Sequence, residues 1–249
     1  MYLNLAAYHF VPIADPDALV AALRSRAEAG ALRGSVLVAG EGINLFLAGT
    51  DAAIAGFVAQ LRDDPRFADI VARYSRSDAQ PFARLKVKRK REIISFRRDD
   101  ASPLQARAPA VAPTTLARWI GQGHDDAGQR LVLLDTRNRE EVRHGTFAGA
   151  STLPIDRFTD LPAALDGHRD VLADATVVSF CTGGIRCEKA ALWMRANGFD
   201  NVLQLDGGIL GYFERVGGEG YDGACFVFDQ RTALDSELRP VDPATTHPA

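Results

Sequence analysis

The sequence predicts an α/β protein made of two domains. The first part follows the order β-α-β-β-α-β, which is that of a ferredoxin-like domain, expected here at 1–98. Residues 114–220 alternate apolar strand runs with helical segments, and this alternation is typical of a parallel sheet flanked by helices. Between them, residues 99–113 contain three prolines and little periodicity, so we expect a linker there and a C-terminal extension and tail at 221–249.

The elements of the first domain follow from turn and capping signals. Asp15 is placed to cap a helix that begins at Pro16, and Thr50-Asp51 to cap a second helix. Glycines at 40 and 42 predict a hairpin between two apolar runs. The expected elements, in order, are a strand at 3–13, a helix at 15–29, strands at 34–39 and 43–48, a helix at 50–62, a strand at 67–75 and a strand within 85–96.

The second domain is expected to repeat strand–helix units. Thr114-Thr115 is predicted to cap its first helix, and Asn138 precedes a short helix that ends in a turn at 145–149. Further strands are expected at 131–135, 175–180 and 201–205, with helices near 161–165, 188–195 and after 206–209. Ligands of parallel sheets bind at the carboxyl ends of the strands, which is where Cys181 falls.

Bulk composition excludes several classes of protein. The 249 residues are 47% hydrophobic and 24% charged, as in ordinary globular proteins, and no apolar run could span a bilayer. The N-terminus lacks the features of a signal peptide, and three cysteines make no disulfide framework. We therefore expect a cytoplasmic protein with reduced thiols and no membrane partner.

Charge is distributed unevenly along the chain. Residues 1–110 hold 16 Lys and Arg against 12 Asp and Glu, whereas residues 111–249 hold 13 against 20. The basic excess is densest between Arg84 and Arg98, a segment with eight basic residues and one acid. Such a segment suits either a solvated edge strand or contacts to a nucleic-acid backbone, although no aromatic signature of an RNA-recognition motif accompanies it. Strand alternation would place Lys86, Lys88 and Lys90 on one face, and Arg89 and Arg91 on the other.

The loop that follows the 175–180 strand carries the chemistry. Cys181 stands where that strand ends and a helix is about to begin, so converging amides and the helix N-terminus should lower the pKa of its thiol. The residues that complete the loop are Thr182, Gly183, Gly184, Ile185 and Arg186. Four residues between the cysteine and the arginine make a loop one residue shorter than that of cysteine phosphatases, and a shorter loop suits a single sulfur atom better than a phosphate.

Residues around this loop have two interpretations each. Arg186 would bind the loop's charge or a substrate anion, or would form a salt bridge that holds the loop rigid. Cys187 would resolve a persulfide or sulfenate on Cys181, or would be a buried thiol. Asp135 and Arg137 end the neighbouring strand and are expected to brace the loop rather than to do chemistry. The five histidines show no metal-ligand spacing, and no nucleotide-binding glycine motif follows a strand, so no metal or cofactor is evident.

Several motifs together resemble one known family. The Cys181–Ala190 segment, C-T-G-G-I-R-C-E-K-A, is similar to a rhodanese active-site loop, as are Asp135-Thr-Arg137 with Glu140-Glu141 and the turn at 205–209. With Gly40-Glu-Gly-Ile-Asn44, the 85–93 segment and the 225–231 segment that begins at Cys225, the chain resembles the bacterial oxygen-dependent tRNA uridine hydroxylases. That resemblance implies an acylphosphatase-like domain followed by a rhodanese domain.

The resemblance also implies an activity, which is hydroxylation of the wobble uridine of tRNA to 5-hydroxyuridine. Cys181 would be the essential cysteine, tRNA the partner, molecular oxygen the co-substrate, and a sulfur or electron donor that the sequence does not identify would complete the reaction. It would also make the basic segment, with Lys86, Lys88, Arg89, Lys90 and Arg91, a tRNA-binding surface. The residues leave two alternatives open. One is a rhodanese-type sulfurtransferase that relays persulfide sulfur, with tRNA as a conceivable acceptor, and the other is a non-catalytic RNA-binding module.

Overall fold

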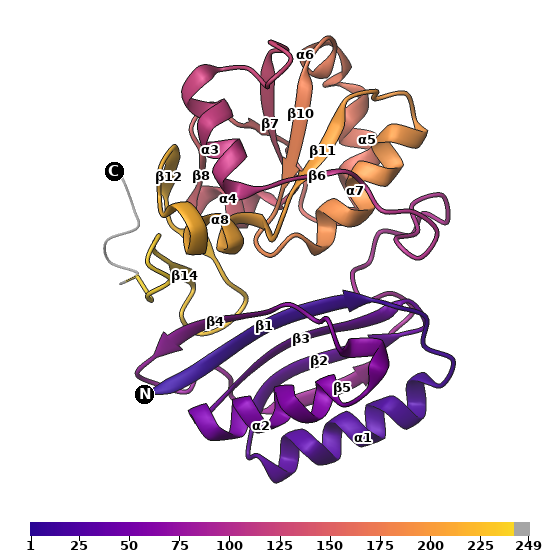
Figure 1. Cartoon of the computed structure of the whole chain (residues 1–249), viewed down its shortest axis with the longest axis vertical. Helices are drawn as coiled ribbons and strands as arrows, with labels where there is room; N and C mark the ends of the chain where they lie inside the picture. Colours follow the sequence, from indigo (N-terminus) through magenta and orange to yellow (C-terminus); the bar gives the residue numbers. More distant parts are fainter. Residues whose placement is uncertain (242–249) are drawn as a thin grey trace. The chain divides into compact units, whose positions relative to one another are not determined.

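The computed structural model describes residues 1–241, and the chain divides into two compact units (Figure 1). Unit 1 contains Met1–Ser95 together with the returning segment Phe228–Arg231. Unit 2 contains Phe96–Val227 and the chain from Thr232 onward. The last part of the expected tail, 242–249, lies outside the described residues. Within residues 1–241, the helices are all too short or too polar to cross a membrane.

Unit 1 is a five-stranded sheet with two helices on one face. The strand order β4-β1-β3-β2-β5 adds β5, parallel to β2, to a ferredoxin-like core. Its elements are β1 Tyr2–Phe10, α1 Pro16–Ala29, β2 Arg33–Ala39, β3 Gly42–Gly49, α2 Asp51–Arg62, the 3₁₀ turn η1 Pro65–Phe67, β4 Ala72–Ser77 and β5 Leu85–Arg89. Helix residues such as Leu23 and Phe57 pack on strand residues such as Val36 and Leu45.

In unit 1, the local sequence signals predicted where the two helices begin, but they predicted the start of one strand wrongly. Asp15 caps α1 by accepting a hydrogen bond from the Ala18 amide at 3.1 Å, and Thr50 caps α2 through Ala53 at 3.2 Å, as expected. The strand expected at 67–75 begins only at Ala72. Asp64 accepts from the Arg66 amide and starts η1 instead, and this turn buries Phe67 in the core.

Unit 2 contains a parallel sheet in the order β6-β11-β10-β7-β9. Its apolar strands β7 and β10 are fully paired over five residues, and Figure 1 shows helices on both sides of the sheet. The elements are β6 Ala110–Val111, α3 Pro113–Gln122, β7 Leu131–Asp135, α4 Arg139–His144, β8 Gly145–Phe147, β9 Ser151–Thr152, η2 Phe158–Asp160, α5 Leu161–Asp166, α6 Arg169–Leu172, β10 Thr176–Phe180, α7 Ile185–Ala196, β11 Val202–Leu205, α8 Gly208–Val216, β12 Tyr221–Gly223, β13 Cys225–Phe226 and β14 Ala233–Leu234. The expected fold class of this part is confirmed.

Three local expectations for unit 2 were wrong. Helix α3 begins at Pro113 after Ala112, without a side-chain cap, because proline is itself suited to the first helical position. The end of the expected linker is ordered, since β6 pairs with β11. The turn expected at 145–149 contains β8, which pairs with β12 of the C-terminal extension, a long-range contact that no local pattern reports.

Candidate active site

Cys181 lies at the carboxyl end of β10, the central strand of the sheet in unit 2. The loop that it begins turns at once into α7, whose N-terminus lies against the sulfur. The Gly184 amide donates a hydrogen bond to Cys181 Sγ at 3.2 Å. Gly184 has a φ of 96°, a left-handed conformation that glycine adopts without strain, so a glycine there lets the amide turn toward the sulfur.

The surroundings of Cys181 favour its ionised form. Burial by itself raises the pKa of a thiol, but a hydrogen bond from Cys187, the charge of Arg186 and the loop amides outweigh it. Together they lower the pKa of Cys181 to about 5. The group is therefore a thiolate at neutral pH, which is the reactive form of cysteine.

Cys187 is the protonated partner of that thiolate. Burial and the neighbouring negative sulfur of Cys181 both raise the pKa of Cys187 far above its ordinary value. Its sulfur also lies 3.7 Å from Thr136 Oγ1, and this hydroxyl contacts the Phe180 carbonyl at 2.9 Å. Both cysteines are completely buried, so two thiols of opposite protonation state lie side by side within the protein.

Arg186 is held in place by Glu141, a residue of α4. Two parallel hydrogen bonds of 2.6 Å join the guanidinium to the carboxylate, and the carboxylate also accepts a bond from Thr182 at 3.2 Å. Burial raises the pKa of Glu141, but the charge of Arg186 more than reverses this effect, so the carboxyl stays ionised. This bidentate geometry orients Arg186 and anchors both ends of the loop to α4.

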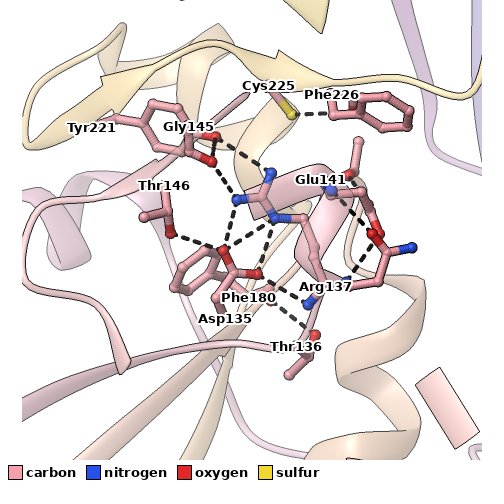
Figure 2. Close-up of polar contacts among 12 residues, drawn as sticks. Asp135, Thr136, Arg137, Glu141, Gly145, Thr146, Phe180, Tyr221, Cys225 and Phe226 are labelled. Carbon is pink, nitrogen blue, oxygen red and sulfur yellow. Dashed lines mark hydrogen bonds and ion pairs between the residues drawn. The ribbon is translucent and has the colours of Figure 1, made fainter. Parts of the chain in front are cut away.

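Asp135 and Arg137 form a second buried ion pair at the end of β7 (Figure 2). Their closest hydrogen bond is 2.6 Å, and Thr146 adds one to Asp135 at 2.8 Å. Arg137 also donates to the Gly145 carbonyl at 2.6 Å. Because Asp135 is paired with Phe180 in the sheet, this network holds the strand end from which Cys181 projects.

The C-terminal extension completes this network. Tyr221 of β12 donates its hydroxyl proton to the Gly145 carbonyl at 2.9 Å and lies 3.4 Å from Arg137 (Figure 2). Cys225 is buried nearby, and burial raises the pKa of its thiol to about 12 despite a hydrogen bond with Thr182. All three cysteines therefore gather around one loop, but only Cys181 is stabilised as a thiolate.

Gly208 closes the loop from the side of α8. A side-chain carbon at this position would lie 2.4 Å from the Cys181 carbonyl oxygen and 2.6 Å from the Gly184 nitrogen, both of which are backbone atoms. In the absence of a side chain, the Ile209 amide reaches the Cys181 carbonyl at 2.9 Å and the Leu210 amide reaches that of Thr182 at 3.0 Å. The start of α8 thus fixes the backbone of the loop.

The site joins most, but not all, of the residues that the sequence singled out. Cys181, the loop through Arg186, and Cys187 come together, with Asp135 and Arg137 one strand away. The basic segment belongs to unit 1 up to Ser95, whereas its last two arginines, Arg97 and Arg98, belong to unit 2. Sequence reasoning missed the roles of four residues: Glu141, Gly208, Tyr221 and Cys225. Glu141, Gly208 and Cys225 stood within segments that resemble the family, whereas Tyr221 had no local signal. Among residues 1–241, no group of three or more His, Cys, Asp or Glu is arranged to hold a metal.

Comparison with known families divides the chain into two parts, as the structure does. Residues 2–93 match the UPF0176 acylphosphatase-like domain, and residues 113–215 match the rhodanese-like domain. With a thiolate loop at the end of a parallel strand, the chain is a rhodanese-domain protein that carries an additional N-terminal α+β domain.

Full-length relatives identify the family. The chain is 70% identical over 241 residues to the tRNA uridine(34) hydroxylase of Xanthomonas campestris pv. campestris (strain B100), covering 97% of this chain and 95% of that one. It is 69% identical to the enzyme of the same name from Xanthomonas axonopodis pv. citri (strain 306), with 97% of each chain covered, and 63% identical to that of Xylella fastidiosa (strain M23), with 96% and 93% covered. The chain belongs to the tRNA uridine(34) hydroxylase family.

Proposed function

We propose that this protein hydroxylates C5 of uridine 34 in tRNA, with molecular oxygen as co-substrate and Cys181 as the nucleophile. The observation that carries the proposal is the buried thiolate of Cys181, held by the Gly184 amide and the charge of Arg186, in a chain of this family. A thiolate is the form of sulfur that can add to a pyrimidine ring.

Addition of the thiolate supplies what the chemistry of uracil otherwise lacks. C5 of the intact conjugated ring is a poor nucleophile. When Cys181 forms a bond to C6, the electron pair of the C5–C6 double bond moves into an enolate and makes C5 electron-rich. That carbon then reacts with oxygen to form a hydroperoxide. Cys181 is buried in the free protein, so the loop has to uncover the sulfur before a base can reach it.

The reaction also needs two electrons, and thiols can supply them. Loss of the C5 proton expels the Cys181 thiolate and restores the double bond of the ring. The freed Cys181 then takes the outer oxygen of the hydroperoxide and becomes a sulfenic acid, while C5 keeps a hydroxyl group. A second thiol converts the sulfenic acid into a disulfide and water, so one oxygen molecule and two thiols yield one hydroxyl, one water and one disulfide. Cys187 is the thiol that lies beside Cys181, and a cellular thiol would reduce the disulfide.

The basic segment of unit 1 is proposed to bind the tRNA backbone. Lys86 and Lys88 are exposed on β5, and Lys90 and Arg91 are exposed directly after it. Arg89 forms an ion pair of 2.5 Å with Asp17 at the start of α1. Alternation therefore separates Lys86 and Lys88 from Arg89, as expected, but the strand ends before Lys90 and Arg91, whose faces alternation does not determine. Cations at this density attract a phosphate backbone.

Nucleoside analysis tests the activity directly. Purified protein, oxygen, a thiol reductant and a tRNA with uridine at position 34 should yield 5-hydroxyuridine, and Cys181→Ser should yield none while it binds the same tRNA. Cells that lack the protein should lose the hydroxylated nucleoside. If a thiolated nucleoside disappears instead, the protein is a sulfur relay, and an active Cys181→Ser enzyme would refute the proposed nucleophile.

The step at C6 has its own test. A tRNA with 5-fluorouridine at position 34 should remain covalently attached to Cys181, because the fluorine replaces the C5 proton whose loss would release the enzyme. Mass spectrometry of the digested complex locates the adduct. If no adduct forms with an enzyme that binds this tRNA and hydroxylates the normal one, a persulfide on Cys181 becomes the better explanation.

A further inference from the structure

The sheet of unit 1 has one face that its own helices do not cover. Val36, Leu45, Leu47 and Val87 point toward α1 and α2, where they form the core. Since successive side chains of a strand alternate, the residues between them point to the opposite face. This second face, which we call the open face because no helix of unit 1 covers it, can be mapped from the pairing of the strands. Other segments cover part of it, since Asn44 on this face is buried and donates a hydrogen bond to the Ile93 carbonyl at 3.2 Å.

The strand registers place aromatic and basic residues in line on the open face. Lys86 of β5 is opposite Ser35 of β2, and Ser35 is opposite Phe46 of β3. The next row places Lys88 beside Leu37. Strands lie about 4.8 Å apart, so the backbones of Lys86 and Phe46 are separated by roughly 10 Å. A lysine side chain and a nucleotide can span such a distance together.

Phe46 is exposed in a strand that is otherwise closely packed. Its two neighbours, Leu45 and Leu47, are fully buried, whereas 38% of Phe46 is accessible. Lys86 and Lys88 are exposed too, and among the described residues neither of them forms an ion pair, in contrast to Arg89. An isolated surface phenylalanine is common, but one in register with an unpaired lysine, with a second unpaired lysine in the next row, has the chemistry of a nucleic-acid contact.

From this arrangement we propose that the open face binds a single-stranded part of the tRNA by stacking a base on Phe46 while Lys86 and Lys88 hold the adjoining phosphates. The proposal rests on tRNA being the substrate and adds the surface that receives it. Sheets of the RNA-recognition type use aromatic side chains on an uncovered face in this way. Every base has a flat π-face, so stacking of this kind secures the strand without selecting its sequence.

Tyr74 and Arg76 offer matched controls on the opposite side of the same sheet. Tyr74 is 40% exposed, close to the value for Phe46, and is paired with the core residue Leu5. Arg76 follows on the same face and pairs with Asp51 of α2. Substitutions there remove an exposed ring or a cation without touching the open face.

The experiment measures binding of a transcript of the substrate tRNA to the full-length protein at several salt concentrations. Phe46→Ala should weaken binding roughly 5- to 150-fold, as expected for loss of one base–aromatic stack. Phe46→Tyr should bind like the wild type, and Phe46→Leu should remain weak because it keeps apolar bulk but no π-face. Lys86→Ala with Lys88→Ala should reduce the slope of log affinity against log salt by about 0.7 to 0.9 for each phosphate that the variant no longer neutralises. Tyr74→Ala and Arg76→Ala should change neither quantity.

Each result has a definite meaning. Full affinity in Phe46→Ala or Phe46→Leu, or an equal loss in Tyr74→Ala, overturns the stacking proposal, and melting curves with the Phe46→Tyr variant exclude loss of fold as the cause. An unchanged salt slope in the lysine variant overturns the phosphate contacts. The wild-type protein could also show the expected dependence of tRNA binding on Phe46 and on salt but form no hydroxylated uridine. That result would contradict the proposed function and still support tRNA binding by the open face. Normal hydroxylation, together with tRNA binding that does not depend on Phe46, would support the proposed function and overturn the stacking proposal.

Discussion

At the residue scale, the two neighbouring buried cysteines differ in protonation: Cys187 holds its proton and Cys181 does not. Cys181 is held as a thiolate by the loop amides and Arg186, and its negative charge in turn keeps Cys187 protonated. One sulfur is thus in the ionised form that the proposed attack on C6 requires, and the other keeps its proton. The ion pair of Arg186 with Glu141 maintains this difference in protonation, because it fixes the position of Arg186, whose charge lowers the pKa of Cys181.

Replacement of Cys187 tests whether it resolves an oxidised sulfur or only packs as a buried thiol. If Cys187 resolves an oxidised sulfur, Cys187→Ser should complete a first turnover but recycle slowly, so the multiple-turnover rate falls much more than the single-turnover rate. Rapid-quench and steady-state measurements on the same preparation provide the two rates. A thiol that only packs would leave the ratio of these rates at its wild-type value.

The low pKa of Cys181 should also appear in the pH dependence of stability. In the unfolded chain this thiol titrates near its ordinary value of about 8.5, and in the folded protein near 5. Between these values the unfolded state binds one more proton, so the free energy of unfolding rises with pH. The stabilisation is complete above the unfolded pKa and is lost as the pH falls through the folded one.

Denaturant unfolding of wild type and Cys181→Ser at a series of pH values measures this contribution. The free energy of unfolding of the wild type should increase relative to that of Cys181→Ser as the pH rises from about 5 to about 8.5, since serine does not titrate in this range. Parallel curves for the two proteins would mean that Cys181 is not ionised in the folded state.

At the element scale, the active loop is held by three separate pieces of chain. Helix α4 supplies Glu141, the turn into α8 supplies the Ile209 and Leu210 amides, and β12 supplies Tyr221. The rhodanese-like match ends at 215, so β12 and β13 lie beyond it and still contribute to the network around Arg137 and Thr182. The C-terminal extension is therefore part of the active site's support.

Gly208 is the position where this support is most sensitive. Its φ of 62° and the backbone atoms within 3 Å of an added carbon leave no room for Gly208→Ala. We expect that variant to lose activity and stability together, since α8 must move away from the loop. Gly183→Ala is the matched control for stability, because an added carbon there meets nothing within 4 Å, and calorimetric melting of both compares them. Equal melting temperatures for the two variants would show that the close approach does not hold the loop.

At the scale of the whole molecule, the proposed tRNA binding and the proposed chemistry belong to different units. The thiolate loop belongs to unit 2, and the exposed lysines of β5 belong to unit 1. A relay between small sulfur carriers would need only the loop, so the exposed lysines favour a protein that acts on an RNA. A hydroxylase and a relay that delivers sulfur to tRNA would both use such lysines, and the nucleoside analysis separates these two activities.

Burial of Cys181 gives a prediction at this scale. A thiolate that no solvent reaches should react slowly with iodoacetamide, and binding of substrate tRNA should increase the rate if it selects the state in which the loop uncovers the sulfur. Mass spectrometry of timed alkylation reports on each cysteine separately, with the buried and protonated Cys225 as an internal control. Alkylation of Cys181 that tRNA leaves unchanged or slows would contradict this view of access.

The amino-acid sequence by itself determined what depends on neighbouring residues. Strand and helix periodicity, the caps at Asp15 and Thr50, and the strand–loop–helix setting of Cys181 are local, because each is set within a few residues. The family motifs were local too, and they were enough to indicate the fold class and the nucleophile.

Only the tertiary structure decided which distant residues meet. Glu141 reaches Arg186, Tyr221 reaches Gly145 and Cys225 reaches Thr182 because sheet register and helix packing bring them together, and no short pattern encodes such distances. The direction in which Phe46 points is also decided by the tertiary structure. Its strand carries large apolar side chains on both faces, because Leu45 and Leu47 lie on one face and Phe46 lies on the other beside Asn44. The position of α1 and α2 on one side of the sheet decides which face is covered.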